Sequence, residues 1–219
     1  MSGFFSGSNP IFRFTGRVLD VIVLSALWLF CLLGIVTIGP ATAALYYSCA
    51  KCLRRGEPGA YSSFFHAFRL NLRTGAAATA VWLVAALILD AVYLFFTMGA
   101  QVEGGGWALA RVVYCVLLLL PLGALCLTFP LLSRFTYTAG SLLANAFRLT
   151  IRHLPRILAL AAVNLVLAVV TVWGWYYGLM LLTPAIAALA SSFLLEPLFR
   201  RYTPAEETEE GMETPWYLR

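Results

Sequence analysis

The chain has 219 residues, of which 61% are hydrophobic and 11% are charged, with a formal net charge of +5. Its mean hydropathy is +0.84, whereas a soluble globular domain carries about 25% charged residues. These values exclude an ordinary soluble domain and indicate an integral, all-α membrane protein.

Runs of about 20 apolar residues, which cross a hydrocarbon core of about 30 Å as a helix, define the expected membrane spans. The predicted transmembrane helical bundle, residues 1–202, has six spans in three hairpins: 18–38, 41–55, 75–98, 107–132, 157–173 and 177–196. Segment 41–55 is short and only partly apolar, so we expect it to be tilted or shielded by its neighbours.

The placement of basic residues supports six spans, because Lys and Arg gather at the cytoplasmic ends of membrane helices. With both termini in the cytoplasm, all of the Lys and Arg residues except Arg111 fall on that side. The remaining segment, 203–219, contains five glutamates and one arginine. This composition predicts a solvated, disordered cytoplasmic tail.

Two basic stretches repeat at an offset of 79 residues: AFRLNLR from Ala67 and AFRLTIR from Ala146, with a weaker copy, FRFTGR, from Phe12. Helices at about 61–74 and 140–154 would each align their arginines on one face. We expect basic interfacial helices, each followed by two spans, in a parallel repeat. The candidate residues for lipid contact or partner docking are Arg13, Arg17, Arg69, Arg73, Arg148, Arg152 and Arg156.

Charged residues inside a membrane are costly and usually paired. Asp90 lies within the third predicted span and Arg111 near the start of the fourth. A turn near Glu103 would bring both to a similar depth, so we predict an ion pair, either as a structural bridge or as part of a solute or proton site. Solvent exposure of the two side chains is the remaining alternative. Glu196, with Arg200 four residues later, predicts a second pair at a membrane edge.

The segment Asn9 to Tyr47, NPIFRFTGRVLDVIVLSALWLFCLLGIVTIGPATAALYY, resembles the opening of the YesL-like family of small bacterial membrane proteins. The resemblance is carried by Arg13, Gly16, Arg17 and Asp20 at a set distance from TIGPATAAL, and FFHAFRLNLR is similar to the family's second block. It implies a multi-pass protein of the bacterial cytoplasmic membrane. Family members have no established biochemistry and tend to be associated with carbohydrate uptake systems and their sensors.

Two classes of function follow. The first is a non-catalytic accessory or regulatory component of carbohydrate uptake, whose partners are membrane lipids and a transporter permease or sensor kinase. The second is a small transporter or channel, which would require Asp90, Asn164, Pro121 and Pro184 to converge on one water-accessible cavity. The sequence has no catalytic, metal-ligating, cofactor-binding or nucleic-acid-binding pattern, so we expect no enzyme activity, cofactor or nucleic-acid partner.

Overall fold

The structure is a computed structural model that describes residues 10–102, 105–173 and 178–202. Within these ranges the regular elements are all helices, as the all-α prediction requires. Short 3-10 turns at Ile35–Thr37 and Leu179–Leu181 precede α2 and α8, and a π-helical turn, Cys49–Arg54, extends α2. The helices are α1 (Pro10–Cys31), α2 (Ile38–Ser48), α3 (Ala60–Val102), α4 (Gly105–Leu117), α5 (Leu119–Leu132), α6 (Ala139–Arg152), α7 (Leu154–Trp173) and α8 (Thr183–Phe199).

Helix α2 forms the centre of the fold. It packs against α1, α3, α5 and α8, and most of its side chains are buried. The predicted second span, 41–55, corresponds to α2 and its π-helical turn, and it is shielded by its neighbours. Burial on several sides explains why this segment lacks the continuous apolar surface of a lipid-facing helix.

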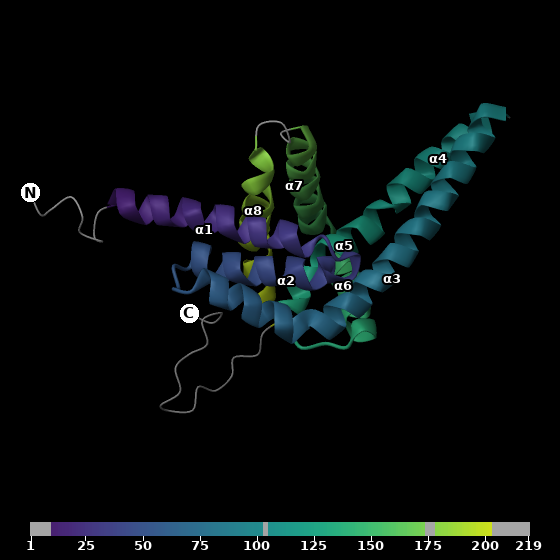
Figure 1. Cartoon of the computed structure of the whole chain (residues 1–219). Coiled ribbons are helices and arrows are strands. Elements are labelled where there is room, and N and C mark those ends of the chain that lie inside the picture. The colour runs from purple at the N-terminus through teal and green to yellow at the C-terminus, as the bar shows by residue number, and fades with distance from the viewer. Residues whose placement is uncertain (1–9, 103–104, 174–177, 203–219) are drawn as a thin grey trace, which may run out of the picture.

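The other helices leave this centre in two directions (Figure 1). In this view α1, α2 and the first part of α3 run across the molecule, whereas α7 and α8 stand upright. The second part of α3 lies beside α4 and forms an arm that extends away from the body. Helix α1 therefore lies crosswise to α7 and α8, which the six-span prediction did not anticipate.

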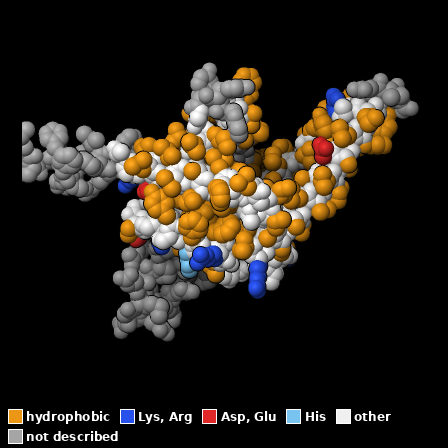
Figure 2. Space-filling model, in the orientation of Figure 1, with side chains coloured by type: hydrophobic (Ala, Val, Ile, Leu, Met, Phe, Trp, Pro, Cys, Tyr) orange, Lys and Arg blue, Asp and Glu red, His pale blue; other side chains and the backbone are white. Residues whose placement is uncertain are grey.

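Three helical stretches are long and apolar enough to cross a membrane: Ala60–Gly99, Gly106–Leu132 and Leu154–Trp173. Helix α8 is a shorter apolar helix. Large hydrophobic side chains are exposed along the arm and on α7, and Figure 2 shows this orange surface on the arm and the upright helices. Such a surface favours lipid over water, which indicates a membrane protein.

The two copies of the basic repeat differ in how they continue. In the first copy, the expected surface helix 61–74 and the expected span 75–98 form one continuous helix, α3. In the second copy, α6 and α7 are separate helices on either side of His153. Pro155 stands where the first copy has Ala76, and proline has no backbone N–H to donate to the carbonyl of Ile151, so the helical bonds cannot continue across His153.

Helix α3 bends between the body and the arm (Figure 1). The Thr79 hydroxyl donates to the Gly75 carbonyl oxygen at 2.7 Å. Such bonds from a threonine to the carbonyl four residues earlier bend helices, and we attribute the bend to this pair. The bend lies within a single helix, α3, which contains both the expected surface segment 61–74 and the predicted span 75–98.

Prolines set two other helix boundaries. The predicted span 107–132 is interrupted at Leu118, because Pro121 has no N–H to donate to the carbonyl of Leu117. Pro184 lies in the first turn of α8, where the missing N–H breaks no helical bond. It therefore lies at the start of a helix, although the predicted span 177–196 begins seven residues earlier.

Helices α2 and α3 cross with their backbones in close contact. A β-carbon at Gly39 would lie 2.7 Å from the Gly75 carbonyl oxygen, and one at Gly75 would lie 2.9 Å from the Pro40 ring. The Gly39 amide also donates to the Thr79 hydroxyl at 3.0 Å. Small residues allow membrane helices to approach in this way, so these two glycines fix the α2–α3 crossing.

Candidate functional site

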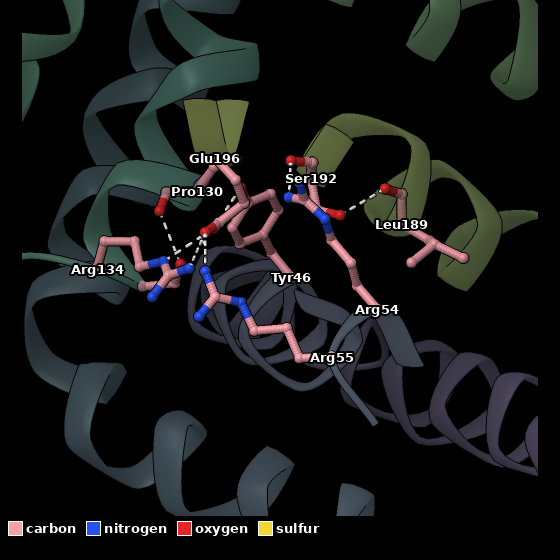
Figure 3. Close-up of polar contacts among 9 residues, drawn as sticks. Tyr46, Arg54, Arg55, Pro130, Arg134, Leu189, Ser192 and Glu196 are labelled. Atoms are coloured by element: carbon pink, nitrogen blue, oxygen red, sulfur yellow. Dashed lines mark hydrogen bonds and ion pairs between the residues drawn. The ribbon is translucent and has the colours of Figure 1, made fainter. Parts of the chain in front are cut away.

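A buried carboxylate lies where α2, α5 and α8 meet (Figure 3). Glu196, near the end of α8, is 2% exposed. Arg134 donates to both of its oxygens, from Nε to Oε1 at 3.0 Å and from Nη2 to Oε2. Arg55 forms a further ion pair, with 3.6 Å between Nη2 and Oε2, and the Tyr46 hydroxyl donates to Oε1 at 3.3 Å.

The π-helical turn brings two consecutive arginines to α8. Arg55 approaches Glu196, while Arg54 donates from Nη1 to the Ser192 carbonyl oxygen at 2.6 Å. The Arg54 guanidinium also lies 4.8 Å from the centre of the Phe193 ring, a cation–π contact. The turn therefore attaches α2 to α8 through both arginines, and π-helical turns are often found at functional sites.

Sequence reasoning missed this cluster. It predicted a local pair between Glu196 and Arg200, whereas the observed ion partners come from the end of α5 and the turn after α2. Arg134 is 62 residues away from Glu196 in the sequence. The one available signal was that Glu196 is the only acidic residue of α8, and this does not identify its partners.

A cavity of about 520 Å³ adjoins the cluster and is bounded by residues of α1, α2, α5, α7 and α8. Tyr46 lines this cavity and also binds Glu196. Asn164 donates to the Ser191 hydroxyl at 3.1 Å, and Thr171 donates to the Thr183 hydroxyl at 2.7 Å. Because these polar groups bond to one another and the rest of the lining is mainly apolar, the cavity resembles a site for an apolar molecule more than one for a sugar.

The convergence expected for a solute pathway is partial. Asn164 and Pro184 both line the cavity. Pro121 instead lines a separate apolar pocket with residues of α3 and α6, and Asp90 lies on the arm, exposed. Among the described residues, no three His, Cys, Asp or Glu side chains are grouped as a metal site requires.

Asp90 and Arg111 lie on neighbouring helices of the arm, but they form no ion pair in the described structure, where the ion pairs are those of Glu196. Next to them, the Tyr114 hydroxyl of α4 donates to the Leu89 carbonyl oxygen of α3 at 2.6 Å. Asp90 is exposed and Arg111 is partly exposed, so each side chain points to the surroundings of the arm. The predicted pair is therefore absent from this arrangement.

The effects of Asp90→Ala and Arg111→Ala on the free energy of unfolding are expected to add to within about 0.5 kcal/mol, because the two side chains share no contact. A double-mutant cycle on the protein in detergent, followed by tryptophan fluorescence during unfolding, measures the coupling. A coupling energy above about 1 kcal/mol would restore the ion pair predicted from sequence.

The arginines of the repeated motif lie on the surface. Arg69 and Arg73 of α3 and Arg148 and Arg152 of α6 are all exposed, and none forms an ion pair within the described residues. Figure 2 shows most of the visible Lys and Arg side chains along the lower edge of the body. The remaining docking candidates are an exposed Arg17 in α1, a partly exposed Arg156 in α7, and Arg13, whose side chain lies outside the described part.

Residues 21–93, about a third of the chain, match the family described as "Protein of unknown function, DUF624". The match is consistent with the YesL-like resemblance seen in the sequence, and it includes the Gly39–Gly75 crossing and the π-helical turn. No curated protein and no solved structure matches the chain. The predicted tail, 203–219, lies outside the described residues.

Proposed function

We propose that the protein is a non-catalytic accessory or regulatory component of the membrane that docks a partner in carbohydrate uptake, a transporter permease or a sensor kinase, through its basic surface. The observation that carries this proposal is the division among its arginines. Arg54, Arg55 and Arg134 bind other parts of the chain. The four arginines of the repeated motif, in contrast, are exposed in both copies. The same spacing of exposed arginines therefore occurs twice on the surface.

The proposed orientation places this basic surface in the cytoplasm, because basic residues gather on that side of membrane proteins. An exposed pair of arginines one turn apart suits an acidic surface of a partner, where complementary charge speeds association and selects the partner. The assignment to carbohydrate uptake rests on the family resemblance alone.

The proposal is tested by gentle purification of the tagged protein from its own host membrane, followed by mass spectrometry of the proteins recovered with it. Changing Arg69, Arg73, Arg148 and Arg152 together to Gln is expected to lower recovery of a permease or sensor kinase at least about tenfold, because each substitution removes a charged hydrogen-bond donor. The variant must still insert, which fractionation of the membrane establishes. Equal recovery from both proteins would contradict the proposal.

The cavity beside Tyr46 favours a second function, binding or passage of a small, largely apolar molecule. Ala188 lines the cavity, and Ala188→Phe would fill part of it. This variant tests the two functions separately. Partner recovery is unaffected if docking on the basic surface is the function. Loss of a transport or binding activity with partner recovery intact would favour the cavity.

A further inference from the structure

The second copy of the basic motif lines a pocket to which the first copy contributes no residue. A hollow of about 280 Å³ lies between the segment after α5, one face of α6 and the end of α8. Its polar lining residues are Tyr137, Asn145, Arg148, Arg152 and Tyr202. Asn145, Arg148 and Arg152 lie three and four residues apart on α6, so they share one face of the helix.

Several donors in this pocket have no partner in the part of the chain that the structure describes. The Asn145 amide and the Arg148 guanidinium make no hydrogen bond or ion pair there, and Tyr137 makes only a ring contact with Phe135. Hydrogen-bond donors grouped in a pocket without acceptors are suited to bind an oxyanion.

One wall of the pocket is held in position by its own contacts. The Tyr202 hydroxyl and the His153 Nε2 atom are 2.9 Å apart, and the Arg152 guanidinium lies 5.9 Å from the centre of the Tyr202 ring. Burial, followed by the positive charges of Arg152, Arg156 and Arg201, lowers the pKa of His153 below its ordinary value. The region therefore has an excess of positive charge that a bound anion would relieve.

We propose that this pocket binds a phosphate group, contacted by the Arg148 and Arg152 guanidinium groups, the Asn145 amide and the Tyr137 hydroxyl. Guanidinium groups bind phosphate oxygens with paired hydrogen bonds, and the amide and hydroxyl supply donors for the remaining oxygens. The phosphate belongs either to the headgroup of an anionic lipid or to a soluble phosphate ester. This inference stands on the pocket itself and does not require the proposed docking of a protein partner.

The first copy of the motif provides a matched control. Arg69 and Arg73 have the same spacing and are also exposed, but neither is part of the lining of this pocket. A change of both to Gln removes the same charge as a change of Arg148 and Arg152. If the anion binds in the pocket, the change of Arg148 and Arg152 will weaken binding more than the change of Arg69 and Arg73. If anions are attracted only by the general positive charge, the two changes will have equal effects.

The experiment uses the full chain in neutral detergent and two probes. Native mass spectrometry measures retention of phosphatidylglycerol against phosphatidylcholine, and phosphorus NMR measures binding of inorganic phosphate. Arg148→Gln with Arg152→Gln is expected to weaken binding of at least one probe about tenfold or more, and Arg69→Gln with Arg73→Gln less than about twofold. Thermal unfolding of each variant establishes that it is folded, and Tyr137→Phe with Asn145→Ala gives a second test that leaves the charge unchanged.

Each outcome has one interpretation. If the changes at Arg148 and Arg152 weaken binding of phosphatidylglycerol alone, the ligand is a lipid headgroup. If they weaken binding of inorganic phosphate, the ligand is a soluble phosphate ester. An equal effect of the two arginine pairs, full binding by the Tyr137→Phe and Asn145→Ala variant, or no binding of either probe to the unaltered protein would overturn the proposal.

Discussion

Glu196→Ala is expected to lower the free energy of unfolding by about 3–5 kcal/mol, because it leaves Arg134 and Arg55 in a buried position without their carboxylate. The Arg134 side chain is 5% exposed and that of Arg55 15%, so water can replace the lost carboxylate only in part. The substitution also removes the acceptor of the Tyr46 hydroxyl. Unfolding in mixed micelles, followed by tryptophan fluorescence, measures the loss.

Two variants control this result. Glu57→Gln removes a carboxylate that forms no ion pair within the described residues, and it is expected to change stability by less than about 0.5 kcal/mol. Glu196→Ala combined with Arg134→Ala is expected to cost less than the sum of the single changes, because the buried charge is removed with its partner. Fully additive losses would show that the cluster contributes little as a unit.

Gly39→Val is expected to destabilise the fold by about 2–3 kcal/mol or more, because the new side chain would meet the backbone of α3 and force the two helices apart. The nearest backbone atom, the Gly75 carbonyl oxygen, would lie 2.7 Å from the new β-carbon. Separation of the helices would also break the bond from the Gly39 amide to Thr79. The same unfolding experiment measures the change.

Gly16→Ala is the matched control for Gly39, because a β-carbon at Gly16 would meet no atom within 4 Å. Alanine is favoured over glycine in a helix by up to about 1 kcal/mol, so this control is expected to be neutral or stabilising. Comparable destabilisation by the two substitutions would show that a general effect, and not the α2–α3 crossing, is responsible.

The features that were predicted correctly from sequence depend on neighbouring residues. Long apolar runs indicate helices, as in α3 and α7, because in lipid the backbone must satisfy its own hydrogen bonds. The shielding of residues 41–55 was also expected, since their composition suits neither lipid nor water. The break at Leu118 was not part of the expected span 107–132, and Pro121 accounts for it.

The features that were not predicted depend on contacts between distant residues. Glu196 has an arginine four residues later, and a single sequence cannot show that Arg134 and Arg55 lie closer in the folded chain. Trp82 provides another example, because its indole donates to the Thr128 hydroxyl of α5 at 3.2 Å. The crosswise direction of α1 was missed for a related reason: hydropathy indicates that a helix contacts apolar surroundings but not how it is tilted.

The π-helical turn Cys49–Arg54 also constrains the length of the chain at this point. Each hydrogen bond in a π-helix closes over five residues instead of four, so the turn holds one residue more than α-helical geometry would. Deletion of a single residue would let the segment close as an α-helix with the following residues still in phase, whereas insertion of one more residue would rotate them by about 100° and turn Arg54 and Arg55 away from Ser192 and Glu196. Insertions among relatives should therefore be accommodated after the turn, where Gly56 and Gly59 have positive φ angles of 79° and 87°, and be excluded from the turn itself.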